Sequence, residues 1–412
     1  MTKKSDAPAI RFKGFSDAWE QREVGDLLIE RSQQAPMSDE YPLMAFIANE
    51  GVAPKGERYD RSALVTDTVN KLYKKTEKGD FIYSSNNLET GSIGLNKYGK
   101  ACISPVYSIF EPTGIADSDF LGRRLVRKDF INAMVKWRQG VIYGQWRIHE
   151  SDFLKIEISV PSVEEQRKIG AYLDQLDNLI TLHQRKFEKL TNVKKSMLEK
   201  MFPQNGSSYP EIRFKGFTDP WEQRKLGELV DRVVRKNTNN ESTLPLTISA
   251  QYGLVDQITY FNNRVASRDV SNYYLVLNGE FAYNKSTSDG YPFGAVKRLD
   301  LYEKGVLSTL YIVFAPKKEQ QIDSDYLTVF FDTDRWHKGV AERAAEGARN
   351  HGLLNISAED FFDIDLSVPK DIVEQKQIGA FIRQLDNLIT LHQRELKKLQ
   401  NIKKSMLEKM FV

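Results

Sequence analysis

Two groups of side chains in this sequence could in principle carry out chemistry. The first group is five histidines, which are His149, His183, His337, His351 and His392. They form neither the close pair of a zinc site nor a triad with a nucleophile. The second group is the carboxylates Glu164, Glu165 and Glu374, which could serve a nuclease. Each falls at the predicted start of a helix after a Ser-Val-Pro stretch, where negative charge complements the helix dipole. We expect these carboxylates to be structural and the chain to hold no metal ion.

Motifs for nucleotide and base chemistry are also missing. The sequence has no GxxxxGK[ST] phosphate loop, no GxGxxG after a strand, and no Asn- or Asp-Pro-Pro-Tyr stretch of the kind that holds a target base in amino-methyltransferases. The single cysteine, Cys102, excludes an intramolecular disulfide and a cysteine-based zinc site. It aligns with Val306 in the internal repeat described below, which predicts a small core residue. We expect no catalytic residue in this chain.

The bulk composition describes a folded protein without a membrane segment. The 412 residues are enough for more than one domain, and 28% charged with 41% hydrophobic residues is typical of a globular chain. No apolar run approaches the roughly 18 residues of a membrane span, and the first residues do not resemble a signal peptide. A cytoplasmic location is therefore expected. The net charge of +3 requires any contact with nucleic acid to come from local patches.

The segments that would position functional residues occur twice in the sequence. PAIRFKGFSDAWEQREVGDLL, from Pro8, returns as PEIRFKGFTDPWEQRKLGELV, from Pro210. QLDNLITLHQR occurs unchanged at 175–185 and 384–394, and 23 of 29 positions are identical between 174–202 and 383–411. The intervening segments have low identity but share landmarks, such as KGDFIY with NGEFAY and DSDFL with DSDYL. This pattern indicates duplication of a whole domain of about 200 residues, not a solenoid of short units.

Each variable segment predicts a mixed α+β domain. Short β-rich runs such as FIYSS, CISPVYSIF, EFAYN and TLYIVFAP lie between Gly, Asn and Ser clusters. DSDFLGRRLVRKDFINAMVKW and DSDYLTVFFDTDRW predict a helix that begins after an Asp or Ser cap. The predicted divisions are a repeat segment (1–22), a first variable domain (23–158), a central helical spacer (159–203), a linker with the second repeat segment (204–224), a second variable domain (225–366) and a C-terminal helical spacer (367–412).

The repeated ends predict two long helices that pair as an antiparallel coiled coil. Apolar residues recur at steps of three and four in both copies. The positions expected to set the register are Leu176, Ile180, His183, Leu190, Leu385, Ile389, His392 and Leu399. Neither apolar seam can be buried by its own helix, so the near-identical helix in the same chain is the natural partner. Lys194 and Lys403 also put polar groups into these seams, as residues that fix register do.

Taken together, these residues resemble the specificity subunit of type I restriction-modification systems. The resemblance rests on two variable domains, each followed by a near-identical helix that begins through SVPSVEEQRKIGAYLDQLDNLI or SVPKDIVEQKQIGAFIRQLDNLI. It covers essentially the whole chain, although the second copy has one extra residue before Glu374. The resemblance implies two target recognition domains of one fold, arranged as a pseudo-twofold internal repeat. Each would read one half of a split, asymmetric sequence in double-stranded DNA.

The resemblance also implies partners and cofactors. The paired helices would space the two domains and dock two copies of the methyltransferase subunit, which two copies of the restriction subunit then join. S-adenosylmethionine, ATP and Mg²⁺ would belong to those partners, with no cofactor in this chain. Helices of about 29 residues, roughly 43 Å long, would place two readers about one DNA turn apart or slightly more.

Residues that contact DNA are expected in polar loops where the two halves differ. SSNNLETGS (84–92) corresponds to NKSTSDGYPFG (284–294), and YGQWR (143–147) corresponds to GARNHG (347–352). Amide, hydroxyl and cationic side chains read base edges or hold phosphates. The candidates are Asn86, Asn87, Lys97, Gln145 and Arg147 in the first domain, and Asn284, Lys285, Ser286, Arg349, Asn350 and His351 in the second. The basic run 123–128 is a candidate for phosphate contact or for a solvated helix face.

Two other functions fit parts of this sequence. The first is an interaction scaffold, in which the coiled coil joins proteins and the domains bind protein ligands without reading DNA. The second is a nuclease or methyltransferase complete in one chain, for which the expected motifs are missing. Salt-dependent binding of DNA together with a methyltransferase would separate DNA reading from a protein-only scaffold.

Overall fold

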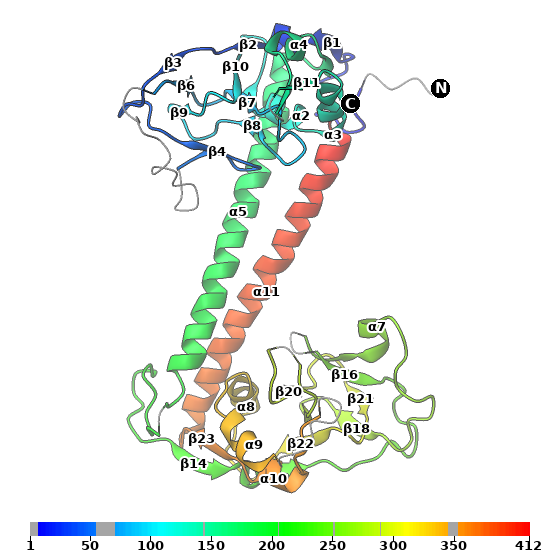
Figure 1. Ribbon diagram of the computed structural model, residues 1–412. Helices are drawn as coiled ribbons and strands as arrows, with labels where there is room; N and C mark the ends of the chain where they lie inside the picture. The colour runs from blue at the N-terminus through cyan, green and yellow to red at the C-terminus, as the bar shows by residue number, and fades with distance from the viewer. Residues whose placement is uncertain are drawn as a thin grey trace. The chain divides into compact units, whose positions relative to one another are not determined.

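The structure of the chain is a computed structural model that describes residues 7–54, 71–142, 145–204, 206–249, 252–288, 290–344 and 353–412 (Figure 1). It divides into two compact units. The first unit comprises 1–184 with 395–412, and the second comprises 185–394. Each unit therefore contains one variable segment, the first part of the helix that follows it, and the last part of the other long helix. The division into six segments made above stays a prediction.

The first unit has a mixed α+β fold. Its elements before the long helix are β1 (Glu20–Glu23), α1 (Val24–Leu27), β2 (Leu28–Glu30), β3 (Gln34–Ala35), β4 (Ala45–Ile47), β5 (Gly51–Ala53), β6 (Tyr73–Thr76), β7 (Phe81–Tyr83), β8 (Ile93–Leu95), β9 (Ala101–Ile103), β10 (Ser108–Pro112), α2 (Ser118–Arg124), α3 (Lys128–Val135), β11 (Gln139–Ile142), β12 (Gln145–Arg147), α4 (Glu150–Leu154) and β13 (Glu157–Val160). The central sheet has the order β2-β10-β7-β8, and all its pairs are antiparallel.

The second unit repeats this topology. Its elements are β14 (Glu222–Lys225), α6 (Leu226–Leu229), β15 (Val230–Arg232), β16 (Leu246–Ser249), β17 (Gly253–Asp256), α7 (Gln257–Phe261), β18 (Tyr274–Leu277), β19 (Phe281–Asn284), β20 (Ala295–Arg298), β21 (Lys304–Leu307), β22 (Ile312–Pro316), α8 (Ser324–Phe331), α9 (His337–Arg343), α10 (Ala358–Phe362) and β23 (Asp365–Val368). The sheet order β15-β22-β19-β20 matches that of the first unit. The prediction of one α+β fold written twice is confirmed.

The predicted helix after Asp117 is two helices in the structure. The Asp117 side chain caps α2 by accepting a hydrogen bond from the backbone N–H of Phe120, and Asp323 caps α8 in the same way through Tyr326. Arg127 then takes an extended backbone (φ −71°, ψ 149°) as the N-cap of α3, which ends the first helix and starts a second. Capping was predicted correctly, but the single continuous helix was not.

Cys102 is a core residue, as predicted. It is fully buried in β9 and bridges Leu43, while Val306 in β21 bridges Pro245 in the second unit. The two residues therefore hold the same place in the two copies of the fold. Burial raises the pKa of the Cys102 thiol, so it stays protonated and unreactive.

Two helices of 38 residues, α5 (Val163–Lys200) and α11 (Ile372–Lys409), follow the variable segments. At 1.5 Å per residue each is about 57 Å long. They exceed the 29-residue repeated stretch because they begin directly after the Ser-Val-Pro strands. At the start of α5, Ser162 Oγ accepts a hydrogen bond from the backbone N–H of Glu165. At the start of α11, which follows one extra residue, Asp371 accepts one from the backbone N–H of Val373 instead. None of the helices in the described part of the chain is both long and apolar enough to cross a membrane.

The two helices pack together in opposite directions, which confirms the predicted antiparallel pair. Asp177 of α5 pairs with Lys403 of α11 at 2.5 Å in the first unit. In the second unit Lys194 of α5 pairs with Asp386 of α11 at 2.7 Å. Of the positions expected to set the register, Leu176 and Leu385 are buried, and Ile180, His183, Leu190, Ile389, His392 and Leu399 are half-buried. That the two histidines fix the register stays a prediction.

The end of each long helix completes the core of the unit in which it ends. Phe411, after α11, stacks on Phe120 at 5.3 Å and meets Trp19 edge-on at 6.5 Å. Phe202, after α5, packs equivalently against Trp221 and Tyr326, each at 5.8 Å. The core of each unit therefore needs a helix end that is separated in sequence from its own variable segment.

The N-terminal repeat segments fasten these helices at both ends. Arg11 holds Glu165, in the first turn of α5, through two hydrogen bonds of 2.7 Å, and Arg213 holds Glu374 at 2.7 and 2.8 Å. The backbone N–H of Ile10 also donates to the carbonyl of Lys409, near the end of α11. The structural role expected for Glu165 and Glu374 is confirmed, and their main partner is an arginine.

Gln166 and Gln375 join each long helix to the capped helix of its variable segment. The side-chain oxygen of Gln166 accepts a hydrogen bond from the backbone of Asp117, and Gln375 does the same for Asp323. Next to them, a Cβ at Gly170 would lie 2.6 Å from Asp117 Oδ1, so only glycine allows this close approach.

We expect Phe411→Ala to destabilise the first unit and Phe202→Ala to destabilise the second. Each change removes a buried ring and leaves a cavity, which costs about 3–5 kcal/mol. Hydrogen exchange followed by mass spectrometry would show lost protection mainly in the β2-β10-β7-β8 sheet for the first variant and in the β15-β22-β19-β20 sheet for the second. Leu179→Ala, at an exposed position, is the control. Equal loss of protection in both sheets from either variant would contradict this assignment.

Candidate nucleic-acid interface

Two of the polar loops singled out in the sequence lie against each other in the first unit. The Asn86 side-chain oxygen accepts a hydrogen bond of 2.6 Å from the backbone N–H of Trp146. Ser85 Oγ likewise accepts one of 3.1 Å from the backbone N–H of Ile148. The loop after β7 is thereby joined to the ribbon of β11 and β12. The structure brings together residues that are about 60 positions apart in the sequence.

The predicted residues of the first unit differ in their surroundings. Asn87 and Arg147 are exposed, while Asn86 is half-buried because it holds the ribbon. The backbone of Gln145 belongs to β12, opposite Ile142, but its side chain lies outside what the structure describes. Asn87, Arg147 and Lys97 are thus the candidates of this unit that present a described polar side chain to solvent.

In the second unit, the loop after β19 is joined to residues 353–356. The carbonyl of Lys285 accepts a hydrogen bond from the backbone of Leu354, and its ammonium group donates to the carbonyl of Ile356. Ser286 forms a bridge with Leu353, and Asn284 accepts a hydrogen bond of 3.0 Å from the Ser286 backbone. The other three candidates, Arg349, Asn350 and His351, lie outside the described residues.

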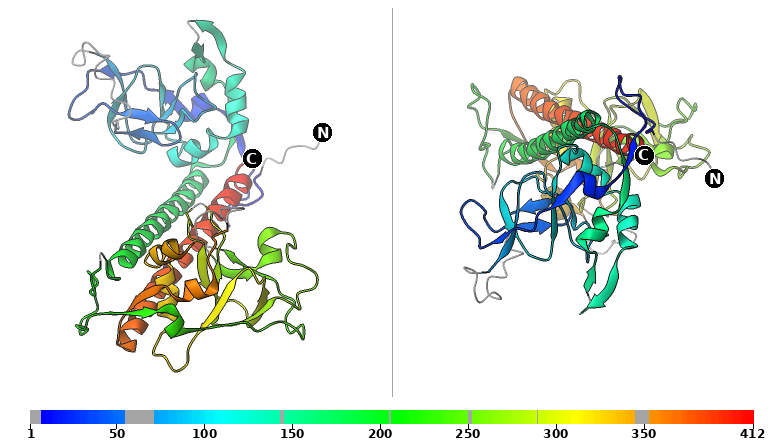
Figure 2. Two further views of the ribbon diagram at one scale, coloured as in Figure 1. Left: turned by 60° about the horizontal axis from the view of Figure 1, so that its bottom comes forward. Right: turned by 90° about the horizontal axis from the view of Figure 1, so that it is seen from above.

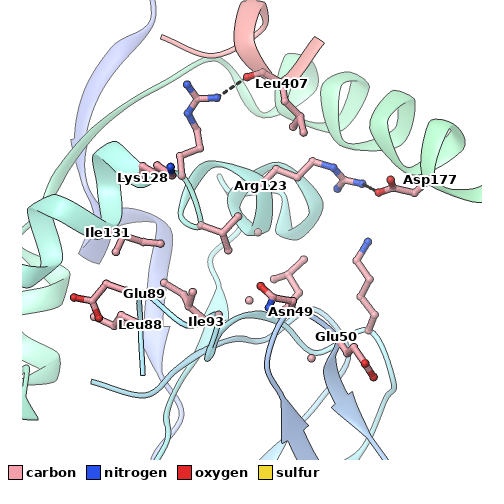
Figure 3. Close-up of a pocket in the computed structure, with 18 of the residues that line it drawn as sticks. Asn49, Glu50, Leu88, Glu89, Ile93, Arg123, Lys128, Ile131, Asp177 and Leu407 are labelled. Atoms are coloured by element: carbon pink, nitrogen blue, oxygen red, sulfur yellow. Dashed lines mark hydrogen bonds and ion pairs between the residues drawn. The ribbon is translucent and has the colours of Figure 1, made fainter. Parts of the chain in front are cut away.

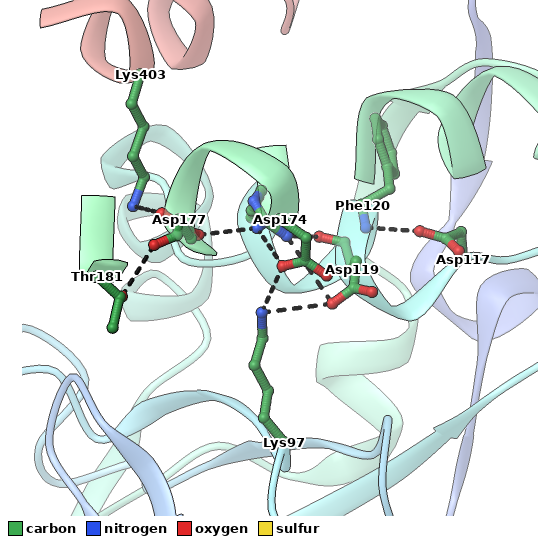
Figure 4. Close-up of polar contacts among 9 residues, drawn as sticks. Lys97, Asp117, Asp119, Phe120, Asp174, Asp177, Thr181 and Lys403 are labelled. Carbon is green, nitrogen blue, oxygen red and sulfur yellow. Dashed lines mark hydrogen bonds and ion pairs between the residues drawn. The ribbon is translucent and has the colours of Figure 1, made fainter. Parts of the chain in front are cut away.

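Lys97 belongs to a different group of side chains. Its ammonium lies 2.8 Å from Asp174 of α5 and 3.5 Å from Asp119 of α2 (Figure 4). Arg123 reaches Asp174 at 2.6 Å and Asp177 at 3.0 Å. The Lys97 charge is therefore directed to the long helix and neutralised there, and the network fastens the variable segment to α5.

Protonation in this network follows from the positive charges around it. Burial alone would raise the pKa of Asp174, but hydrogen bonds from Lys97 and Arg123 outweigh it and lower that pKa to about 2. Burial and the neighbouring Asp174 raise the pKa of Asp119. In the second unit, Lys297 and Lys194 outweigh burial and hold the pKa of Asp332 below its usual value. Each unit thus anchors its helix pair with strongly ionised aspartates.

The three arginines of the basic run 123–128 are engaged within the protein, whereas Lys128 is exposed. Arg124, which is buried, pairs with Asp129 at 2.9 Å, and the Arg127 guanidinium donates to the carbonyl of Leu407. Arg123 is committed to the network just described. The solvated helix face that the sequence suggested is therefore wrong for these arginines, because they point toward carboxylates and the end of α11. They are poorly placed to hold phosphates as well.

A groove of about 950 Å³ lies beside this run in the first unit (Figure 3). Its walls include the apolar side chains Leu88, Ile93, Leu95, Val126, Ile131 and Leu407. Among the lining cations, Lys97, Arg123, Arg127 and Lys403 are each paired with an aspartate, whereas Lys128 is exposed. Because most of its cations are compensated, this apolar-walled groove is a weak site for the DNA backbone, which binds free cations.

Within the described part of the chain, no group of His, Cys, Asp and Glu side chains is arranged to hold a metal ion. His183 and His392 lie half-buried on α5 and α11. Reasoning from the sequence missed two exposed residues of the ribbon, Gln139 and Trp146. The alternation of polar and aromatic residues in QGVI and QWR could have indicated a ribbon, but exposure of a tryptophan needs the fold.

Comparison with known proteins gives consistent results over both halves of the chain. The sequence profile described as "Type I restriction modification DNA specificity domain" matches residues 17–192 and 218–401. The type I restriction enzyme MjaVIII specificity subunit of Methanocaldococcus jannaschii is 23% identical over 411 residues, covering 94% of this chain and 91% of the relative.

A solved structure shares the fold. The S subunit of a type I restriction-modification system from M. genitalium superimposes with a TM-score of 0.58 at 13% identity, covering 98% of this chain and 99% of the other. The HsdS subunit from Thermoanaerobacter tengcongensis gives a TM-score of 0.44 at 16% identity, covering 95% and 96%.

The Asp174 network predicts how stability depends on pH. Because the pKa of Asp174 is about 2 in the folded chain and 3.8 in the reference state, its ionised form stabilises the fold above about pH 4. That contribution is lost as the pH falls toward 2. We therefore expect Asp174→Asn to lower the free energy of unfolding at neutral pH, and the difference from wild type to shrink below about pH 4. Urea unfolding over a pH series measures it.

Asp39→Asn, which changes an exposed carboxylate outside this network, is the control for the pH series. A difference between wild type and Asp174→Asn that grew on acidification would contradict the assignment.

Proposed function

Because the chain belongs to the type I restriction-modification DNA specificity family, we propose that each variable segment reads one half of a bipartite, asymmetric DNA target. The observation that carries this proposal is that two units of one topology present different polar loops at the same place. The loop after β7 exposes Asn87, whereas the equivalent loop after β19 exposes Ser286. Different side chains on one scaffold read different bases.

The chain acts, in this proposal, as a non-catalytic subunit. Its recognition of DNA directs both adenine methylation and restriction, which two methyltransferase subunits and two restriction subunits carry out. S-adenosylmethionine, ATP and Mg²⁺ are used by those partners. The carboxylates that could have suggested a nuclease, Glu165 and Glu374, support this reading because arginines hold both.

Exposed leucines on the long helices support docking of two copies of one partner. Leu179 and Leu182 on α5 are 43% and 45% exposed. Leu388 and Leu391, at the same places in α11, are 37% and 52% exposed. Apolar side chains that recur on two near-identical helices present the same surface twice, so two identical methyltransferase subunits can bind them.

The rival function is a coiled-coil scaffold that joins proteins without reading DNA. It explains the exposed leucines, but it gives no reason for polar loops that differ between two copies of one fold. DNA binding with the methyltransferase that weakens as salt rises favours reading, and its absence favours the scaffold.

Methylated adenines in DNA from cells that express this chain with its methyltransferase test the proposal. We expect two different short sequences, separated by a fixed unread gap. A chain in which residues 225–366 come from a homologue should alter one of those sequences and leave the other and the gap unchanged. A continuous palindromic site, or a change in both halves after the exchange, would contradict two independent readers. So would cleavage or methylation of DNA by the purified chain alone.

Lysine substitutions on the long helices test the docking surface. The pair Leu179→Lys and Leu182→Lys should reduce the number of bound methyltransferase subunits from two to one, because each pair of leucines serves one subunit. The pair Leu388→Lys and Leu391→Lys should do the same, and all four changes should abolish binding. Native mass spectrometry counts the subunits. Thr181→Lys and Thr390→Lys add the same charges at exposed positions on another helix face and should leave two subunits bound.

A further inference from the structure

The β11–β12 ribbon of the first unit is a sheet of its own. Its two strands pair with each other and with none of the other described strands. In both views of Figure 2 it extends from the body of the first unit. A free two-stranded hairpin is marginally stable in water, so its position depends on side-chain anchors. These are Asn86 on the Trp146 backbone, Ser85 on the Ile148 backbone, and a two-bond pair of 2.8 and 2.7 Å between Arg138 and Glu89.

The ribbon is fixed at its base yet exposes a large aromatic side chain. Trp146 is 44% exposed and Trp137, just before the ribbon, is 40% exposed, whereas Trp19, Trp221 and Trp336 are buried. The Arg138 guanidinium lies 5.9 Å from the centre of the Trp146 ring. An exposed tryptophan held beside an arginine is typical of a surface that a partner covers.

Polar side chains lie on the opposite face of the ribbon from Trp146. Gln139 and Arg147 are direct cross-strand partners in the antiparallel register, so they share a face. Trp146, one residue from Arg147, points to the other face because side chains alternate along a strand. Gln139 and Arg147 are both exposed, and Gln139 is oriented by a hydrogen bond of 3.2 Å from its amide nitrogen to Asp152.

We propose that this ribbon enters the major groove of one half-site and that Gln139 and Arg147 read base edges there. The inference rests on the proposed function and specifies its mode of recognition in the first unit. The major groove of B-DNA admits a two-stranded ribbon, and a glutamine and an arginine are the side chains that pair with adenine and guanine edges. Trp146, on the other face, packs against the sugar-phosphate wall or a thymine methyl group.

The charge distribution of the first unit favours this ribbon over the neighbouring groove. Arg123, Lys97 and Lys403 are neutralised by aspartates of the long helix. Arg147, in contrast, is an exposed cation of β12, for which no ion pair within the described part of the chain is found. Base reading needs donors that are accessible and held in place, and the anchored ribbon provides both.

The test uses the full chain in complex with its methyltransferase and a randomised duplex DNA library. Bound DNA is sequenced for wild type, Arg147→Ala, Arg147→Lys and Gln139→Ala. We expect each variant to lose about 10- to 100-fold of the preference at one or two adjacent positions of one half-site, with the other half-site unchanged. Arg147→Lys should lose it too, because lysine keeps the charge but lacks the two-pronged guanidinium. Arg22→Ala, which changes a partly exposed arginine paired with Glu20, is the control.

Three other outcomes distinguish failure of base reading by the ribbon from failure of the proposed function. Sequence preferences that stay intact in all three ribbon variants overturn the ribbon as reader while leaving the proposed function in place. A uniform loss of affinity that Arg147→Lys restores makes Arg147 a phosphate contact and also overturns base reading. A wild-type complex without any sequence preference overturns the proposed function itself. Thermal unfolding that matches wild type shows that these exposed substitutions leave the fold intact.

Discussion

Burial of a helix end in each unit is the interaction on which the rest of this structure depends. Phe411 and Phe202 lie just after the ends of the two long helices, and each fills the core between a tryptophan and the capped helix of a variable segment. Neither unit has a complete core without a helix whose beginning lies in the other unit. The helices must therefore be long, continuous and antiparallel, and they must nearly repeat each other's sequence.

Ion pairs then adapt the same contact, between the helix pair and a variable segment, to two different domains. The aspartate and lysine of the helices pair twice, as Asp177 with Lys403 and as Asp386 with Lys194. The first variable segment adds a cation to this pair, through Arg123, whereas the second adds an anion, through Asp332. A variable segment can contribute either a cation or an anion, because the helix pair carries both an aspartate and a lysine at this contact. Charges used in this way are unavailable to DNA, and the proposed recognition therefore relies on loops and on the ribbon.

Repetition in the sequence was enough to predict the two α+β copies, the antiparallel helices and the equivalence of Cys102 with Val306. Those features depend on apolar spacing, which sequence displays directly. The partners of individual charges could not be predicted in the same way. Lys97 was expected near DNA because its loop is polar, but its partner Asp174 is 77 positions away and is brought close only by the fold. The two helices after Asp117 were missed because the break needs an extended Arg127, for which no proline or glycine gives a signal.

The small contact between helix and variable segment has an evolutionary consequence. Gln166 and Gln375 hold the backbones of Asp117 and Asp323, and Gly170 and Gly379 let those capped helices approach closely. Backbone bonds and a missing Cβ place few demands on the side chains of the segment that docks there. A foreign segment acquired by recombination would need an aspartate-capped helix and a matching pair of end strands. It would also need an aromatic partner for Phe411 or Phe202 and a charge that pairs with the long helices. New specificities can therefore arise by exchange of whole cassettes, without gradual readjustment of the joint.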